Sequence, residues 1–248
     1  MDLVQLCLLL SHGAVFLSVN PLEEMHGNNL KTVVIAGAGG LVGSRLLDLL
    51  LADVTVSKII LLARKQPEVE SKKVEVLLTD FTHIQPLKAK LADAEILYCC
   101  IGTTMKTAGS KEAFRAVDYE IPFRLAELAS AAGIKKFIAV SSLGADPHSR
   151  NFYLKTKGEM ERDIANNFRF QKLAFVRPSM LLGPRKEFRL GEKIGQFFMV
   201  VFSFMMVGRF EKYRPIYDFN VAKAMISVSN SVNNQKVYES AELSWLGR

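Results

Sequence analysis

Tyrosine, lysine and serine side chains occur at spacings suited to reducing a carbonyl group. Tyr153 and Lys157 would lie one turn apart on the same face of a helix. A carbonyl carbon that accepts a hydride leaves an alkoxide, and a phenol beside an ammonium group can protonate it near neutral pH. A serine hydroxyl would hold the carbonyl oxygen. Ser142 is our preferred serine for this role, with Ser141 close behind.

A glycine-rich stretch provides a candidate site for a dinucleotide. It follows the apolar run 32–36 and precedes a helical pattern over 41–51, which is the context that a dinucleotide-binding turn requires. Glycines let the backbone approach a pyrophosphate, and a helix N-terminus offers it free N–H groups. The spacing G-x-x-G-x-x-G also fits a merely tight turn. The expected cofactor contacts here are Gly37, Gly39, Gly40, Leu41, Val42 and Gly43.

Two basic residues indicate which dinucleotide the site prefers. Arg64 and Lys65 follow the second apolar run, where an NAD-binding domain carries an acidic residue for the ribose hydroxyls. Two cations suit a 2′-phosphate instead. We therefore predict NADP(H), with ordinary solvated loop charge as the alternative.

Further candidate contacts follow the third and fourth runs. Asp80 could accept from the adenine amino group, or equally cap the turn after it. Ile101, Gly102 and Thr103 follow a run that ends near Cys100, where the glycine suggests a close approach of cofactor to backbone.

Apolar runs alternate with helical patterns along the chain. This alternation predicts an α/β fold, a Rossmann-type doubly wound parallel sheet with helices on both faces and a small C-terminal substrate-side lobe. The clearest helices are expected over Asp118–Ala132, closed by Gly133, and over Asn220–Ser229. The strands are expected at 32–36, 58–62, 74–78, 96–100, 137–140 and 173–176.

The bulk composition narrows the possible functions. The chain has 248 residues, 49% of them hydrophobic, and a net charge of +7, as expected for a globular protein that binds anionic ligands. Its basic residues are scattered, so we expect no nucleic-acid partner. Neither the three cysteines nor the four histidines have metal-ligand spacing, and we expect no metal. Cysteine usage favours a reducing compartment, and we predict a cytoplasmic protein.

Two apolar segments have no settled role. Residues 1–30 form an atypical leader that could be an extra helix, a weak anchor or the product of a mis-assigned start before Met25. We expect one Rossmann domain over 31–248, with substrate-side elements mainly in 178–248. The stretch Phe197–Val207 is too short for a comfortable membrane span. It favours a buried core or dimer contact, although contact with a membrane is possible.

Several longer strings resemble one known family. The glycine turn, Arg64, the two serines and the Tyr-Lys pair resemble the short-chain dehydrogenase/reductase superfamily. The finer strings resemble its atypical group, the NAD(P)H-binding oxidoreductases of the Tat-interacting type, from about residue 31 to about 225. These strings are C-C-I-G-T-T (99–104), K-T-A-G (106–109), S-S-L-G-A-D (141–146), N-F-Y-L-x-x-K-G-E-x-E (151–161) and F-x-R-P-x-x-L-L (175–182).

The resemblance implies a set of cofactor contacts and leaves the function open. It implies NADPH held by the glycine turn, Arg64, Lys65, the Ile101-Gly102 backbone, Tyr153, Lys157, the Leu181 loop and Arg189. We expect an NADPH-dependent oxidoreductase acting on an unidentified small carbonyl or hydroxyl compound. The alternative is an NADPH-binding redox sensor or scaffold that acts through a protein partner, and epimerisation of a nucleotide sugar ranks last. A homodimer is also possible.

Overall fold

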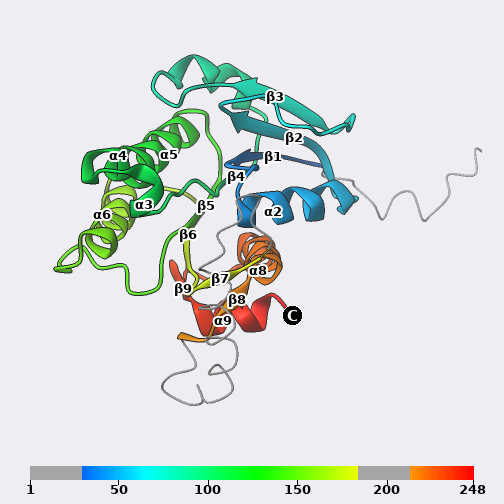
Figure 1. Cartoon of the computed structure of the whole chain (residues 1–248). Coiled ribbons are helices and arrows are strands. Elements are labelled where there is room, and N and C mark those ends of the chain that lie inside the picture. The colour runs from blue at the N-terminus through cyan, green and yellow to red at the C-terminus, as the bar shows by residue number, and fades with distance from the viewer. Residues whose placement is uncertain (1–29, 184–212) are drawn as a thin grey trace, which may run out of the picture.

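The computed structural model describes residues 30–183 and 213–248. Residues 1–29 of the expected leader, the stretch Phe197–Val207 and Arg189 lie outside these ranges. In the described ranges the main sheet has seven parallel strands in the order β3-β2-β1-β4-β5-β6-β9 (Figure 1). The strands are β1 (Lys31–Ala36), β2 (Val56–Ala63), β3 (Val74–Leu78), β4 (Ile96–Cys99), β5 (Lys136–Val140), β6 (Lys172–Arg177) and β9 (Val237–Glu239).

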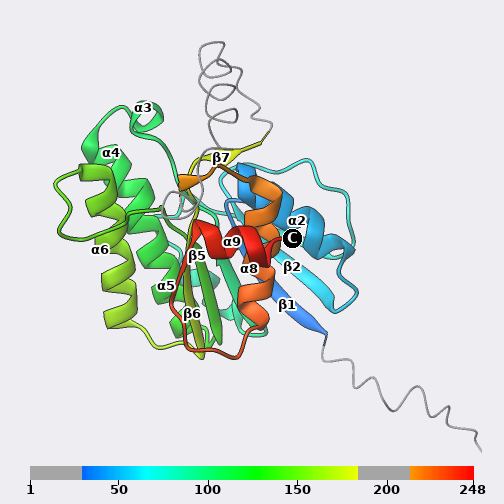
Figure 2. The same cartoon turned by 90° about the horizontal axis from the view of Figure 1, so that it is seen from below.

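Helices cover both faces of this sheet, so the predicted doubly wound Rossmann-type fold is confirmed. One face packs against α2 and α8, and the other against α5 and α6 (Figure 2). The helical segments are α2 (Leu41–Ala52), η1 (Gln85–Leu91), α3 (Met105–Ala108), α4 (Lys111–Arg115), η2 (Ala116–Glu120), α5 (Ile121–Ala131), α6 (Phe152–Asn167), α8 (Asp218–Asn230) and α9 (Ser240–Leu246).

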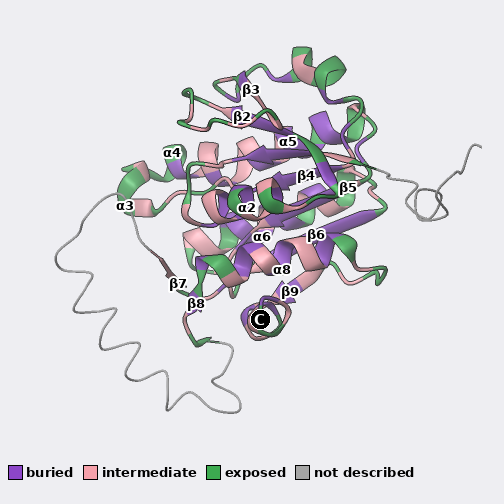
Figure 3. Cartoon of the chain, turned by 90° about the vertical axis from the view of Figure 1, so that its right-hand side faces the viewer, coloured by how far each residue is buried: buried purple, intermediate pink, exposed green. Residues whose placement is uncertain are grey.

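The strands form where the sequence is apolar on both faces. Val33, Val34, Ile35 and Ala36 of β1 are all at most 1% exposed, because helices cover the sheet above and below them. Figure 3 shows the buried strands enclosed by helices whose outer surfaces are partly exposed. The seventh strand, β9, was not predicted. It is three residues long and pairs with β6, from Phe175 opposite Val237 onward.

One predicted helix boundary was wrong. The helix expected to begin at Asp118 begins at Lys111, where the Ser110 hydroxyl accepts a hydrogen bond from the N–H of Ala113 and so caps the first turn. It continues through the π-helical segment η2 into α5 and ends before Gly133, whose φ of 78° gives the expected left-handed stop. Asp118 therefore lies inside the helix and is completely buried.

A small second sheet lies beyond the carboxyl ends of the main strands. β7 (Leu181–Leu182) pairs in parallel with β8 (Ile216–Tyr217), so the chain after β6 and the chain before α8 lie side by side. No helix of the described ranges has both the length and the apolar character that crossing a membrane requires.

Candidate functional site

The candidate site lies where the strand order of the sheet reverses. β1 pairs with β2 on one side and with β4 on the other, and ligands of open α/β sheets bind in the crevice at such a point. The loops that follow β1 and β4 meet there. A Cβ atom added to Gly37 would lie 2.7 Å from the carbonyl oxygen of Cys100, so this approach excludes any larger residue at position 37.

The glycine turn leads directly into α2. Gly37 has a φ of 90°, and its carbonyl oxygen accepts a hydrogen bond from the N–H of Gly40. The next helical turn packs on the same carbonyl, since a Cβ atom at Gly43 would lie 2.1 Å from it. Gly40 caps α2 without a side-chain hydrogen bond, and the first turn of α2 has no acidic residue. This helix terminus can therefore accept an anion.

The two basic residues of the predicted 2′-phosphate site lie just beyond β2. Arg64 and Lys65 are exposed, and neither forms an ion pair with another residue of the ranges 30–183 and 213–248. Asp80 lies just beyond β3, and its Oδ1 atom accepts a hydrogen bond from the N–H of Thr82 at 2.7 Å. This contact caps the local turn, which was the alternative interpretation of Asp80.

Lys157 forms a buried ion pair that the sequence analysis missed. Its Nζ atom lies 2.8 Å from Oδ1 of Asp118, and the two side chains are 4% and 0% exposed. The other carboxylate oxygen, Oδ2, accepts a hydrogen bond of 2.8 Å from the N–H of Thr103. Asp118 thus connects Lys157 to the loop after β4. A Cβ atom at Gly102 would lie 3.4 Å from Asp118 Oδ1 and 3.7 Å from Lys157 Nζ, which places the pair directly beneath that loop.

The ion pair keeps Lys157 charged. Burial by itself would lower the pKa of Lys157, but the carboxylate of Asp118 and then the oxygen of Tyr153 outweigh it, so this pKa is raised. The ring of Tyr153 packs on the buried ring of Phe114, with the centroids 5.3 Å apart. The structure therefore brings together Tyr153 and Lys157, as predicted from their spacing, and adds Asp118.

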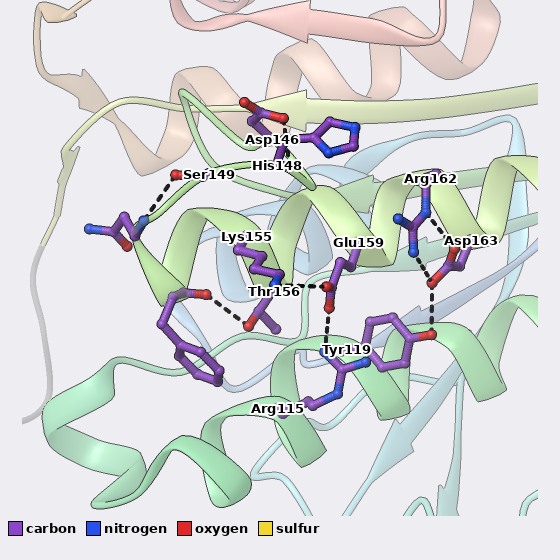
Figure 4. A network of polar contacts seen from close by, with 12 residues as sticks. Arg115, Tyr119, Asp146, His148, Ser149, Lys155, Thr156, Glu159, Arg162 and Asp163 are labelled. Carbon is purple, nitrogen blue, oxygen red and sulfur yellow. Dashed lines mark hydrogen bonds and ion pairs between the residues drawn. The ribbon is translucent and has the colours of Figure 1, made fainter.

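A polar network clamps α6 against the helix that carries Asp118. Arg115 pairs with Glu159, and the hydroxyl of Tyr119 donates to Asp163 at 2.9 Å (Figure 4). The guanidinium of Arg115 also lies over the Tyr119 ring, 4.1 Å from its centroid. These contacts between α6 and the helical run α4–η2 fix how α6 presents Lys157 to Asp118.

The two candidate serines have different surroundings. Ser142 lines a cavity of about 740 Å³ beyond the ends of β5 and β6. Ser141 is 5% exposed, and its hydroxyl has no hydrogen-bond partner among the described residues. Leu154, beside Tyr153 on α6, lines the same cavity as Ser142.

Leu181, a predicted cofactor contact, lies in the small second sheet. Leu181 pairs with Ile216 and packs against the core beneath α2 and α8.

Burial raises the pKa of the Cys99 thiol to about 11. Burial also raises the pKa of the Cys100 thiol, so neither cysteine is a thiolate near neutral pH. Among the described residues there is no cluster of three His, Cys, Asp or Glu side chains that could hold a metal.

Comparison with known proteins identifies relatives with this fold. A family model described as NAD(P)H-binding matches residues 37–199. Protein FMP52, mitochondrial, of Meyerozyma guilliermondii is 34% identical over 200 residues, which cover 78% of this chain and 83% of the relative. Protein HTATIP2 of Rattus norvegicus is 35% identical over 171 residues, covering 68% of this chain and 70% of the relative.

Solved structures share the fold at low sequence identity. The Bordetella bronchiseptica enzyme WbmF in complex with NAD+ has a TM-score of 0.62 and 14% identity, covering 87% of this chain and 77% of WbmF. The ADP-L-glycero-D-manno-heptose-6-epimerase of Helicobacter pylori has a TM-score of 0.61 and 20% identity, covering 85% of this chain and 76% of the epimerase.

The relatives also correct one expectation. The cytoplasmic location predicted from cysteine usage was wrong, because the curated relatives from Meyerozyma guilliermondii, Coccidioides immitis and Candida albicans are all named as mitochondrial proteins. Reduced cysteines do not distinguish between reducing compartments.

Proposed function

This chain belongs to the NAD(P)H-binding family, and on that premise we propose that it is an NADP(H)-dependent oxidoreductase acting on a small carbonyl or hydroxyl compound. The observation that carries the proposal is the position of the charged Lys157. It lies beneath the Gly102 loop, at the point in the sheet where the glycine turn also begins. A cation is thus fixed at the crevice where ligands of such sheets bind.

The chain's residues fit the cofactor. The turn Gly37–Gly43 and the free N–H groups of α2 would hold the pyrophosphate, and the backbone of Ile101 and Gly102 would border the next part of the molecule. Arg64 and Lys65 would pair with a 2′-phosphate, which supports NADPH over NADH. Leu181 and Arg189 stay predictions as cofactor contacts.

The catalytic roles follow from the surroundings of each side chain. NADPH, when bound, supplies a hydride. Tyr153 would give its hydroxyl proton to the substrate oxygen, and Ser142 would donate a hydrogen bond to that oxygen from the cavity wall. Lys157 would stabilise the resulting negative charge on the Tyr153 oxygen. Asp118 would keep Lys157 charged and in place.

We also propose a mitochondrial location, which the names of the FMP52 relatives support. Fractionation of cells expressing the full chain with a C-terminal tag would test it, with recovery outside mitochondria as the contrary result. A homodimer and a protein partner stay predictions.

Calorimetric titration of the full chain with NADPH and then NADH tests the cofactor. We expect micromolar binding of NADPH and at least about tenfold weaker binding of NADH, since a paired phosphate contributes about 1.5–3 kcal/mol. Arg64→Ala should remove most of this preference. Lys236→Ala, an exposed lysine before β9, should not change it. Absence of binding to either dinucleotide would refute the proposal.

A substitution of Tyr153 distinguishes the oxidoreductase from the redox-sensor alternative. Tyr153→Phe should still bind NADPH, because the glycine turn and Arg64 are unchanged, and should lose turnover by about 10²–10⁴-fold, the usual contribution of a positioned acid. A wild-type protein that binds NADPH but reduces no member of a broad carbonyl panel would favour the redox-sensor alternative.

A further inference from the structure

The cavity beside Ser142 has walls that indicate a class of substrate. It lies between the loop after β5 (142–144), the loop after β6 (178–180) and the first turn of α6 at Leu154. Tyr213 and Glu239 complete the described lining. A volume of about 740 Å³ is that of a typical small-molecule site.

Much of the wall is hydrocarbon. Leu143, Leu154, Pro178 and Met180 line the cavity, and Tyr213 contributes an aromatic residue. Met180 is 40% exposed, so part of its side chain is open to a ligand in the cavity. A ligand that buried this side chain would gain free energy in proportion to the apolar area removed from water.

Two polar residues of the wall already have partners. The hydroxyl of Ser179 donates to the carbonyl oxygen of Arg214 at 2.5 Å and accepts from the hydroxyl of Ser240 at 2.9 Å. The Glu239 carboxylate accepts from Arg177 at 3.1 Å and caps the first turn of α9. By contrast, among the described residues the hydroxyl of Ser142 makes only a long contact of 3.4 Å with the carbonyl oxygen of Leu143, so it can turn towards a ligand.

The charged group that includes Glu239 does not favour an anion. Arg177 lies between Glu161 and Glu239, at 2.6 Å from the first and 3.1 Å from the second. One cation and two carboxylates leave this group with a net charge of −1. A substrate carboxylate or phosphate placed against Glu239 would lose its water without gaining a cation from this group.

We infer that the cavity binds an uncharged, predominantly apolar aldehyde or ketone. Its carbonyl oxygen would lie at Ser142, and its hydrocarbon part would pack on Leu143, Leu154 and Met180. The inference rests on the proposed function. The reaction would add a hydride from NADPH to the carbonyl carbon and a proton from Tyr153 to the oxygen, giving an alcohol and NADP+, and solvent would return the proton to Tyr153.

Binding without turnover tests the substrate class. Tyr153→Phe protein, saturated with NADPH, would be titrated calorimetrically with straight-chain methyl ketones of increasing length and with keto acids of matched length. We expect the affinity for ketones to rise up to about fourfold per added methylene group, and each keto acid to bind at least about tenfold more weakly. UDP-glucose should not compete.

A positive charge placed on the cavity wall should reverse the preference for ketones over keto acids. Met180→Lys, made in the same Tyr153→Phe background, should favour the keto acid over the ketone, whereas Val232→Lys, on a fully exposed residue after α8, should leave the order unchanged. Failure of NADPH to bind would refute the proposed function. Normal NADPH binding with keto acids or UDP-glucose bound more tightly than ketones, or with no dependence on chain length, would overturn the substrate class alone.

Discussion

The Nζ atom of Lys157 lies 2.8 Å from the carboxylate of Asp118, and both side chains are sealed from solvent. A buried ion pair is costly to form, because both partners lose water, and costlier to break, because the partner that is left has no counter-charge. Asp118 lies in the π-helical segment η2, and such segments occur often at functional sites. Under the proposed function, stability and catalysis therefore depend on the same two side chains.

A double-mutant cycle should show strong coupling between these residues. Asp118→Asn and Lys157→Met should each reduce the free energy of unfolding by about 3 kcal/mol, because each leaves one buried charge unpaired. The double variant should lose at least about 2 kcal/mol less than the sum of the two single losses. Urea unfolding measures all four proteins. Arg124→Gln, which breaks the half-exposed pair with Glu120 in the same helical run, should cost under about 1 kcal/mol. Additive losses at Asp118 and Lys157 would contradict the coupling.

The same ion pair predicts that stability depends on pH in opposite ways in the wild type and in Asp118→Asn. In the wild type the pKa of Lys157 is raised, so its contribution to stability is fully present below the unfolded value of about 10.4 and is lost as the pH rises through the folded value. In Asp118→Asn the carboxylate is lost, and we expect burial to outweigh the remaining effect of Tyr153 and to place the folded pKa of Lys157 below the unfolded value. The unfolded state then binds more protons, and stability rises with pH.

The measurement is urea unfolding of both proteins from pH 7 to pH 9.5. The difference in unfolding free energy should be largest at pH 7 and should narrow as the pH increases. The double variant Asp118→Asn, Lys157→Met lacks the buried lysine, so its unfolding free energy should not rise with pH in this way. A difference that widens with pH would show that Asp118 does not hold Lys157 in its charged form.

The strands and the glycine turn could be predicted because their signals are local. β3 occupies the predicted residues, and β1, which helices bury on both faces, differs from its prediction by one residue. The position of Tyr153 one turn before Lys157 on α6 follows from helical spacing. The pairing of β9 with β6 joins segments about 60 residues apart, and its three residues have no pattern of their own.

Asp118 was missed for a physical reason that applies to other buried ion pairs. In the sequence it is an acidic residue before a helical pattern, which is typical of an exposed first turn. Its burial depends on how η2 packs against α6, and that contact joins two segments far apart in the chain. One signal was available: Ser110 can cap a helix that begins earlier, which moves Asp118 into the helix interior.

Two alanine substitutions in the glycine turn should have very different effects. A Cβ atom at Gly43 would lie 2.1 Å from the carbonyl oxygen of Gly37, a backbone atom that can move only with the turn. Gly43→Ala should therefore cost about 1–3 kcal/mol, lower the melting temperature by about 3–10 °C and abolish NADPH binding. A Cβ atom at Gly39 meets nothing within 4 Å, so Gly39→Ala should stay within about 0.5 kcal/mol of wild type. Thermal melting with and without NADPH compares them, and equal losses would refute the proposed packing of the turn.

Replacing each serine in turn should identify which one contacts the substrate. Ser142 lines the cavity, and within residues 30–183 and 213–248 its hydroxyl has only a long contact with Leu143. Ser142→Ala should therefore lower kcat/KM for the best-reduced ketone by about 10²-fold and leave the Kd for NADPH unchanged. Ser141 is buried, and its hydroxyl has no partner among the described residues, which costs about 1–3 kcal/mol in the folded state. Ser141→Ala should therefore keep kcat/KM within about threefold and leave the free energy of unfolding equal or slightly higher. Steady-state kinetics and urea unfolding measure both quantities on the same preparations. The reverse result, with activity lost in Ser141→Ala and retained in Ser142→Ala, would mean that the substrate oxygen reaches the inner serine and that the cavity at Ser142 is not where the reaction takes place.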